Sequence, residues 1–156
     1  MFFYHRKMRP KIFSAFILIF WAGFVSSISF MEAWLKFRVP GITLPLGLGI
    51  GKLVFHSLNI MEWIFLFLFA MIRFFEAQSL GRTVNYALAI IVASLTIQTF
   101  WLLPELNERA DQIISGIRPP HSSIHILYGI AEVIKVILLI LAAWFQAHRS
   151  TSGHTR

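Results

Sequence analysis

Apolar residues dominate four long runs along the chain, and the stretches between these runs are shorter and richer in polar residues, Gly and Pro. The runs cover approximately residues 12–35, 53–72, 84–103 and 124–145. A helix needs about 20 apolar residues to cross the roughly 30 Å hydrocarbon core of a bilayer, and helices satisfy their own backbone polar groups in lipid. The pattern predicts an all-α integral membrane protein, a single domain with four transmembrane helices in a bundle.

Composition and charge support the same class of protein. Of the 156 residues, 57% are hydrophobic and only 13% are charged, whereas soluble domains carry about 25% charged residues. The net charge of +7 does not indicate nucleic acid as a partner, because the basic residues flank the apolar runs, where lipid headgroups attract them. The lipid bilayer is the expected partner. The chain has no Cys, which excludes disulfides and thiol chemistry.

Basic residues also predict the orientation of the helices. They are more frequent near the N-terminus, near the C-terminus and in the link between the second and third runs than in the other two connections. Positive residues favour the cytoplasmic side, so both termini are expected inside, in a bacterial inner membrane. The first run is too long for the apolar core of a signal peptide, about 7–15 residues, and is expected to be retained as a span.

The two connections on the opposite side are long and differ in character. Residues 37–52 are apolar and rich in Gly and Pro, and two interpretations stay open for them: an interfacial loop, or a re-entrant segment lining a cavity. Residues 104–123 are polar. They predict a short amphipathic helix that begins at Pro104 and ends at Gly116.

The chain also resembles two helical hairpins in tandem. In each half a Trp-Leu pair precedes the long connection, and a His enters the returning helix about two turns before a Glu: His56 before Glu62, and His125 before Glu132. Such a repeat relates the halves by a pseudo-two-fold axis along the membrane normal. It predicts that the two His–Glu pairs face each other at the same depth.

Polar residues lie on one face of each predicted span. On the fourth, His125, Tyr128, Glu132 and Lys135 are spaced by three, four and three, which places them in one stripe. Exposing such groups to lipid costs at least a few kcal/mol per charge, so we expect them in the bundle interior. The other spans contribute the corresponding polar residues Glu32, His56, Asn59, Glu62 and Gln98.

One pairing follows from depth in the membrane. Glu62 lies ten residues inward from Lys52, and Lys135 lies ten residues inward from His125. Both side chains therefore fall near the middle of the bilayer, where a Glu62–Lys135 ion pair with a structural role is expected.

The remaining His and Glu residues predict a ligand or metal site nearer the outer surface. Two imidazoles and two carboxylates match the ligands of zinc, copper(II), iron or manganese. The expected ligands of a divalent transition metal are His56, His125, Glu32 and Glu132, with Asn59, Tyr128 and Gln98 orienting them through hydrogen bonds. Haem held by the two histidines is a less favoured cofactor. A hydrogen-bonded packing network and a titratable passage for ions or ligands stay open as alternatives.

Three segments resemble an uncharacterised four-span family, the one around transmembrane protein two-hundred-and-five. They are "GKLVFHSLN", "TFWLLPELNERAD" and "HILYGIAEVIK", and together they extend the resemblance over most of the chain. The resemblance implies a four-span fold and a role in moving or tolerating metal-containing compounds. This chain differs in its Gly-rich first connection and in its shorter connection before the fourth span.

These observations lead to three hypotheses for function. The first is a membrane protein that binds a metal ion or small ligand in a polar His/Glu cavity in the outer half of the bundle. The second is a small membrane oxidoreductase that uses a metal or haem. The third is an accessory or structural subunit of a larger membrane complex, or of a homo-oligomer. The sequence leaves open whether the protein is an enzyme.

Overall fold

The computed structural model describes residues 10–76 and 81–151, and these residues form helices joined by short turns. Four of the helical stretches are long and apolar enough to cross a membrane: Phe13–Arg38, Leu44–Phe75, Arg82–Ile114 and Ile124–His148. All-helical structure and four apolar helices of spanning length, both predicted from the hydropathy pattern, are confirmed. Each helix extends beyond the corresponding apolar run, because polar residues at its ends continue the helix.

The elements follow a simple order along the chain. They are α1 (Pro10–Ser26), the π-helical segment η1 (Ser27–Glu32), α2 (Ala33–Leu35), the 3₁₀ segment η2 (Lys36–Arg38), α3 (Leu44–Glu76), α4 (Arg82–Ile97), the π-helical segment η3 (Gln98–Leu102), α5 (Leu103–Ile114) and α6 (Ile124–Thr151).

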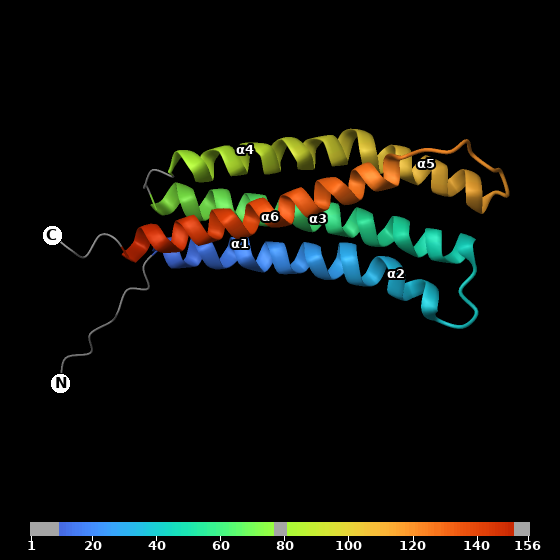
Figure 1. Cartoon of the computed structure of the whole chain (residues 1–156), viewed down its shortest axis with the longest axis horizontal. Helices are drawn as coiled ribbons and strands as arrows, with labels where there is room; N and C mark the ends of the chain where they lie inside the picture. The colour runs from blue at the N-terminus through green and yellow to red at the C-terminus, as the bar shows by residue number, and fades with distance from the viewer. Residues whose placement is uncertain (1–9, 77–80, 152–156) are drawn as a thin grey trace.

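The helical stretches lie side by side and alternate in direction (Figure 1). Helix α1 contacts α3 and α6, α6 also contacts α4, and α5 contacts α3. The turns at residues 39–43 and 115–123 lie together at one end of the molecule, which we call the loop end. The start of α1 and the end of α6 lie at the opposite end (Figure 1).

Large apolar side chains cover the outside of the protein, and charged side chains are buried inside it, unlike in a water-soluble protein. The large apolar side chains of Phe67, Leu53 and Phe74 are 64%, 72% and 80% exposed, whereas Glu62 and Lys135 are fully buried. Soluble proteins almost never bury charged residues while leaving so many large apolar side chains exposed. The distribution is typical of helices that face lipid and keep their charges inside.

The apolar interior combines aromatic and small side chains. Trp21 and Phe65 lie in the core, and their ring centroids are 6.1 Å apart. Ala22 on α1 and Ala142 and Ala143 on α6 are also buried in it. Small residues allow helix backbones to approach closely, which accounts for the extensive contact between α1 and α6.

The expectation of a long Gly-rich loop at residues 37–52 is wrong, both as an interfacial loop and as a re-entrant segment. Helix α3 begins at Leu44, so only a short turn separates it from η2. The Thr43 hydroxyl accepts a hydrogen bond from the Leu46 N–H at 3.4 Å, and Pro45 occupies the first turn, where its missing N–H costs nothing. Gly41, with φ 87°, supplies the left-handed residue of the turn.

Two glycines of α3 allow the preceding segment to lie against the helix. A Cβ added at Gly47 would overlap the ring of Phe37, and one added at Gly51 would lie 3.0 Å from Lys36 Nζ. A Cβ at Gly49 would meet nothing within 4 Å. The helical cost of the glycines is thus offset at positions 47 and 51 by close contact with η2.

The short amphipathic helix predicted for the second connection is confirmed as α5, which continues α4 through η3. Gly116, with φ 81°, ends it as expected. The Ile117 N–H donates to the Gln112 carbonyl at 2.9 Å and the Gly116 N–H to the Ile113 carbonyl at 3.0 Å, which is the Schellman pattern at a helix C-terminus.

The two helical stretches that run towards the loop end share one irregularity. Segments η1 and η3 are both π-helical, and each precedes the helix end that leads to the loop end. A π-turn adds one residue to a turn and shifts the faces of the helix beyond it. The matching positions of η1 and η3 are consistent with two tandem hairpins.

The contact at Gly47 generates a testable prediction. Gly47→Ala should lower the free energy of unfolding by about 1–3 kcal/mol, because the Phe37 ring must leave its place against α3. Gly49→Ala, the matched control, should leave stability unchanged or raise it by up to about 1 kcal/mol through helix propensity. Thermal unfolding in detergent measures both. In a Phe37→Ala background the cost of Gly47→Ala should disappear, and its persistence would show that another contact is responsible.

Candidate functional site

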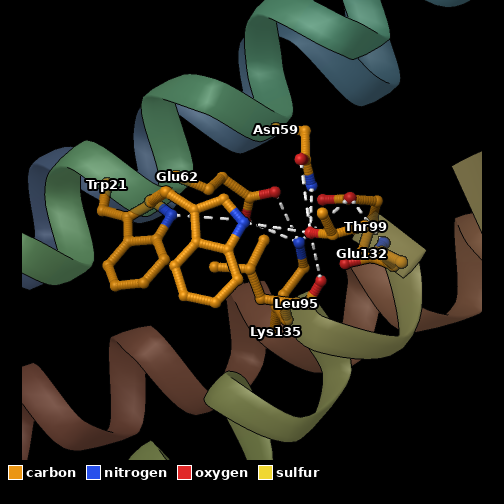
Figure 2. Close-up of polar contacts among 9 residues, drawn as sticks. Trp21, Asn59, Glu62, Leu95, Thr99, Glu132 and Lys135 are labelled. Carbon is orange, nitrogen blue, oxygen red and sulfur yellow. Dashed lines mark hydrogen bonds and ion pairs between the residues drawn. The ribbon is translucent and has the colours of Figure 1, made fainter.

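A lysine and two glutamates meet in the interior of the protein. Lys135 Nζ lies 2.6 and 2.7 Å from the two carboxylate oxygens of Glu62 and 3.1 Å from Glu132 Oε1. The side chains of Glu62 and Lys135 are completely buried, and that of Glu132 is 1% exposed. The structure therefore contains the Glu62–Lys135 pair expected from the depths of the two residues, and adds a second carboxylate to it (Figure 2).

Each of the long helical stretches contributes a side chain to this group. Trp21 Nε1 on α1 donates to Glu62 Oε1 on α3 at 3.3 Å. Gln98 Nε2, at the start of η3, donates to Glu132 Oε1 on α6 at 2.8 Å. We call Trp21, Glu62, Gln98, Glu132 and Lys135 the charge cluster. Hydrogen bonds to charged groups contribute about 1.5–3 kcal/mol each, so the cluster connects all four stretches strongly.

A second polar network lies next to the charge cluster (Figure 2). The Thr99 hydroxyl donates to the Leu95 carbonyl at 2.7 Å and accepts hydrogen bonds from Asn59 Nδ2 and Trp63 Nε1, both at 3.0 Å. One donor and two acceptor positions are the full capacity of a hydroxyl. The network fixes α3 against η3.

Three buried polar atoms near the cluster have no hydrogen-bond partner: Glu132 Oε2, Gln98 Oε1 and the Tyr128 hydroxyl. Tyr128 is 2% exposed and precedes Glu132 by one helical turn, on the same face of α6. An unsatisfied buried polar group costs about 1–3 kcal/mol. The loop-end side of Glu132 is therefore the incompletely satisfied part of the cluster.

A pocket of about 250 Å³ opens at the loop end. Its walls are largely apolar, and its polar lining residues are Lys36, Lys52, Asn107 and His125. Phe55 also lines it, and the Phe55 ring centroid is 5.3 Å from that of Tyr128. Tyr128 therefore packs behind Phe55 in the wall of this loop-end pocket, on the same face of α6 as Glu132.

Both lysines of the pocket also have acidic partners. Lys36 Nζ is 3.4 Å from Glu32 Oε2 and 5.5 Å from the centroid of the Phe55 ring, and Lys52 pairs with Asp111. Neither Glu32 nor Asp111 lines the pocket. An ammonium has three donors, so each lysine keeps hydrogen-bonding capacity after pairing with one carboxylate.

The structure does not bring together the four expected metal ligands. Glu132 lies in the charge cluster, Glu32 pairs with Lys36, and His125 lines the loop-end pocket. His56 is exposed, because six residues rotate it about 120° around α3 from Glu62. Within residues 10–76 and 81–151, no group of three or more His, Asp or Glu side chains could hold a metal ion.

Of the residues expected to orient metal ligands, Gln98 bonds to one expected ligand, Glu132, whereas Asn59 bonds to a residue outside the expected set. Asn59 donates to Thr99 and Gln98 donates to Glu132, while Tyr128 packs on Phe55. The sequence interpretation also missed Trp21, Trp63 and Thr99. Trp21 carried a signal, because tryptophans concentrate at the ends of membrane spans and this one lies in the middle of an apolar run.

Comparison with protein-family models, curated proteins and solved structures gives no match for this chain. The resemblance to the four-span family and the role it implies stay predictions. Functional inference therefore depends on the charge cluster and the loop-end pocket.

The charge cluster predicts a specific pattern of stabilities. Lys135→Met should lower the free energy of unfolding by about 3–5 kcal/mol, because it leaves Glu62 buried without its partner. Adding Glu62→Gln should recover much of that loss. Lys52→Met, which removes the partly exposed pair with Asp111, is the control and should cost at most about 1 kcal/mol. Denaturant unfolding in detergent gives the values, and strictly additive effects of Lys135→Met and Glu62→Gln would contradict the pairing.

Proposed function

We propose that the chain is an integral membrane protein whose four long helical stretches form a transmembrane bundle, with both termini in the cytoplasm. The exposed apolar side chains and the buried charges support membrane insertion. The contacts among α1, α3, α4 and α6 support the bundle. The distribution of basic residues supports the orientation, which puts the loop end at the outer surface.

Within this bundle, the loop-end pocket binds a small amphiphilic anion, that is, a carboxylate or phosphate group attached to an alkyl chain. The observation that carries this proposal is the composition of the pocket wall. Apolar side chains form most of it, and its only charged lining residues are Lys36 and Lys52. Ligand pockets commonly combine an apolar lining with a few convergent polar groups of this kind.

The size and place of the pocket define the ligand further. Its volume of about 250 Å³ is just below the range of about 300–1,000 Å³ typical of small-molecule pockets. A small anion, or the headgroup end of a longer one, therefore fits. Arg38 stacks on the ring of Trp34 at 4.4 Å, near the same end. Trp and Arg are anchors at membrane interfaces, so the pocket lies at headgroup depth.

The lining residues favour binding over catalysis. Ser, Asp and Glu are all absent from the lining, so no carboxylate base or hydroxyl nucleophile faces a ligand there. His125 and Asn107 provide hydrogen bonds that can orient an anionic headgroup. A membrane phospholipid and a free fatty acid share the chemistry that these groups recognise.

Ligand binding is testable with simple probes. Dodecyl phosphate and dodecanoate should bind the protein, and dodecyltrimethylammonium should not, when native mass spectrometry follows release from a non-ionic detergent. Lys36→Met combined with Lys52→Met should weaken binding of the anions at least about tenfold. A tenfold change corresponds to the loss of at least one charge-assisted hydrogen bond. Stronger binding of the phosphate indicates a phospholipid as the natural ligand, and stronger binding of the carboxylate a fatty acid.

Two further variants make the binding test specific. Ala110→Phe fills the pocket and should block binding of both anions, because Ala110 is a buried lining residue. Arg118→Gln removes an exposed charge outside the lining and should change nothing. Equal binding of anionic and cationic probes, or full binding by Ala110→Phe, would disprove the proposed function.

The orientation can be tested with single cysteines, because the chain has none of its own. Ser115 at the loop end and Thr83 near the start of α4 are both exposed. In intact cells, a membrane-impermeant maleimide should label Ser115→Cys. It should label Thr83→Cys only after permeabilisation. The reverse result would place the termini outside.

A further inference from the structure

The charge cluster does not balance if all its groups are ionised. Glu62 and Glu132 carry two negative charges and Lys135 carries one positive charge, and all three are buried. The remaining members, Trp21 and Gln98, are neutral. An uncompensated charge is far more costly in an apolar interior than in water.

The hydrogen bonds of the cluster leave one carboxylate oxygen without a donor. Lys135 donates hydrogen bonds to both oxygens of Glu62 and forms an ion pair with Oε1 of Glu132 at 3.1 Å. Trp21 gives Glu62 a further donor, and Gln98 gives one to Glu132 Oε1. Glu132 Oε2 receives no hydrogen bond, so it is the carboxylate oxygen of the cluster that is open to a proton.

Two residues beside Glu132 also carry buried polar atoms without a hydrogen bond. Gln98 donates through Nε2 to Glu132, while its Oε1 lacks a donor. The Tyr128 hydroxyl interacts with Glu132 without forming a well-aligned hydrogen bond. Among the described residues of the elements packed around the cluster, the titratable side chains that face it are Glu62 on α3 and Tyr128 and Lys135 on α6. The polar side chains from α1 and η3, Trp21 and Gln98, are neutral.

We propose that the charge cluster is a proton-binding site, in which Glu132 is a carboxylic acid with its proton on Oε2. The proton removes the excess charge and leaves Glu62 and Lys135 as a balanced pair. It also supplies the donor that Gln98 Oε1 lacks, so that the amide and the acid form two antiparallel hydrogen bonds. Glu132 Oε2 and Gln98 Oε1 are both acceptors that lack a donor. One proton on Glu132 Oε2 turns that atom into a donor and leaves Gln98 Oε1 as its acceptor.

Exchange of this proton is expected from the loop-end side. Tyr128 lies one turn from Glu132 towards the loop end, and its ring contacts Phe55 in the wall of the loop-end pocket. A tyrosine hydroxyl both donates and accepts hydrogen bonds, so it can pass a proton between the pocket and Glu132. Release of the proton leaves one uncompensated negative charge among the helices. Uptake and release of the proton therefore depend on the charge of any ligand bound between the helices.

Infrared spectroscopy of the protein in lipid vesicles at neutral pH tests the proposal, because a carboxylic acid and a carboxylate absorb at different frequencies. The wild-type protein should show one protonated carboxyl band that shifts in D₂O. Glu132→Gln should lose it. Glu62→Gln should lose it as well, since Lys135 then balances Glu132 and the proton is no longer needed. Glu105→Gln on α5 is the matched control and should keep the full band.

Four results would overturn the proposal, three of which concern the size of the band. These three are the absence of a protonated carboxyl band in the wild-type protein, a band that Glu132→Gln leaves in place, and a band of full size in Glu62→Gln. A band that appears only after sodium and potassium are removed would also overturn it, because a metal cation would then occupy the site. Lys135→Met should double the band if the variant folds. Both glutamine variants preserve side-chain shape, and none of these outcomes depends on ligand binding in the loop-end pocket.

Discussion

A lysine buried among apolar helices must find its opposite charge and its hydrogen-bond acceptors on neighbouring helices, and this requirement governs the structure. Lys135 is fully buried on α6 and is met by two carboxylates. Leaving such a charge unpaired costs about 3–5 kcal/mol, a large share of the stability of an ordinary protein. Glu62 must therefore face α6, and Trp21 must face Glu62. These constraints set the rotation of α1, α3 and α6 about their own axes.

In the proposed membrane setting, apolar packing alone does not specify these rotations, because lipid offers an apolar side chain much the same surroundings as a neighbouring helix does. The Thr99 network adds a second fixed point between α3 and η3. Small residues such as Ala22 and Ala142 then bring α1 and α6 close together. Polar contacts define which faces meet, and small side chains define how closely they meet. The loop end is held by a small apolar cluster of Leu102, Leu103, Ile124 and Tyr128, by two ion pairs and by the contact of Gly47 with Phe37.

Sequence reasoning found the features that depend on one helix or on charge at a given depth. The apolar runs predicted the four long helices, Pro104 and Gly116 predicted α5, and depth predicted the Glu62–Lys135 pair. It failed where a partner from another segment decides the outcome. Glycines at 47 and 51 read as loop residues because glycine weakens helices, but their role is to admit Phe37 and Lys36. His56 was predicted to face inward because it lies in the same polar stripe as Glu62. Residues spaced by three rotate gradually around a helix, however, and this rotation turns His56 outward.

The proposed proton site and the proposed ligand pocket are connected through Tyr128, which is one helical turn from Glu132 and packs on Phe55 in the pocket wall. All of it depends on Lys135 being in contact with both carboxylates inside a membrane. Solid-state NMR in lipid bilayers, with ¹⁵N-labelled lysine and ¹³C-labelled glutamate, measures that contact directly. The account predicts that the Lys135 ammonium nitrogen couples to the carboxyl carbons of both Glu62 and Glu132, and that Glu132→Gln removes one coupling. A Lys135 nitrogen that couples to neither carboxyl carbon would contradict it.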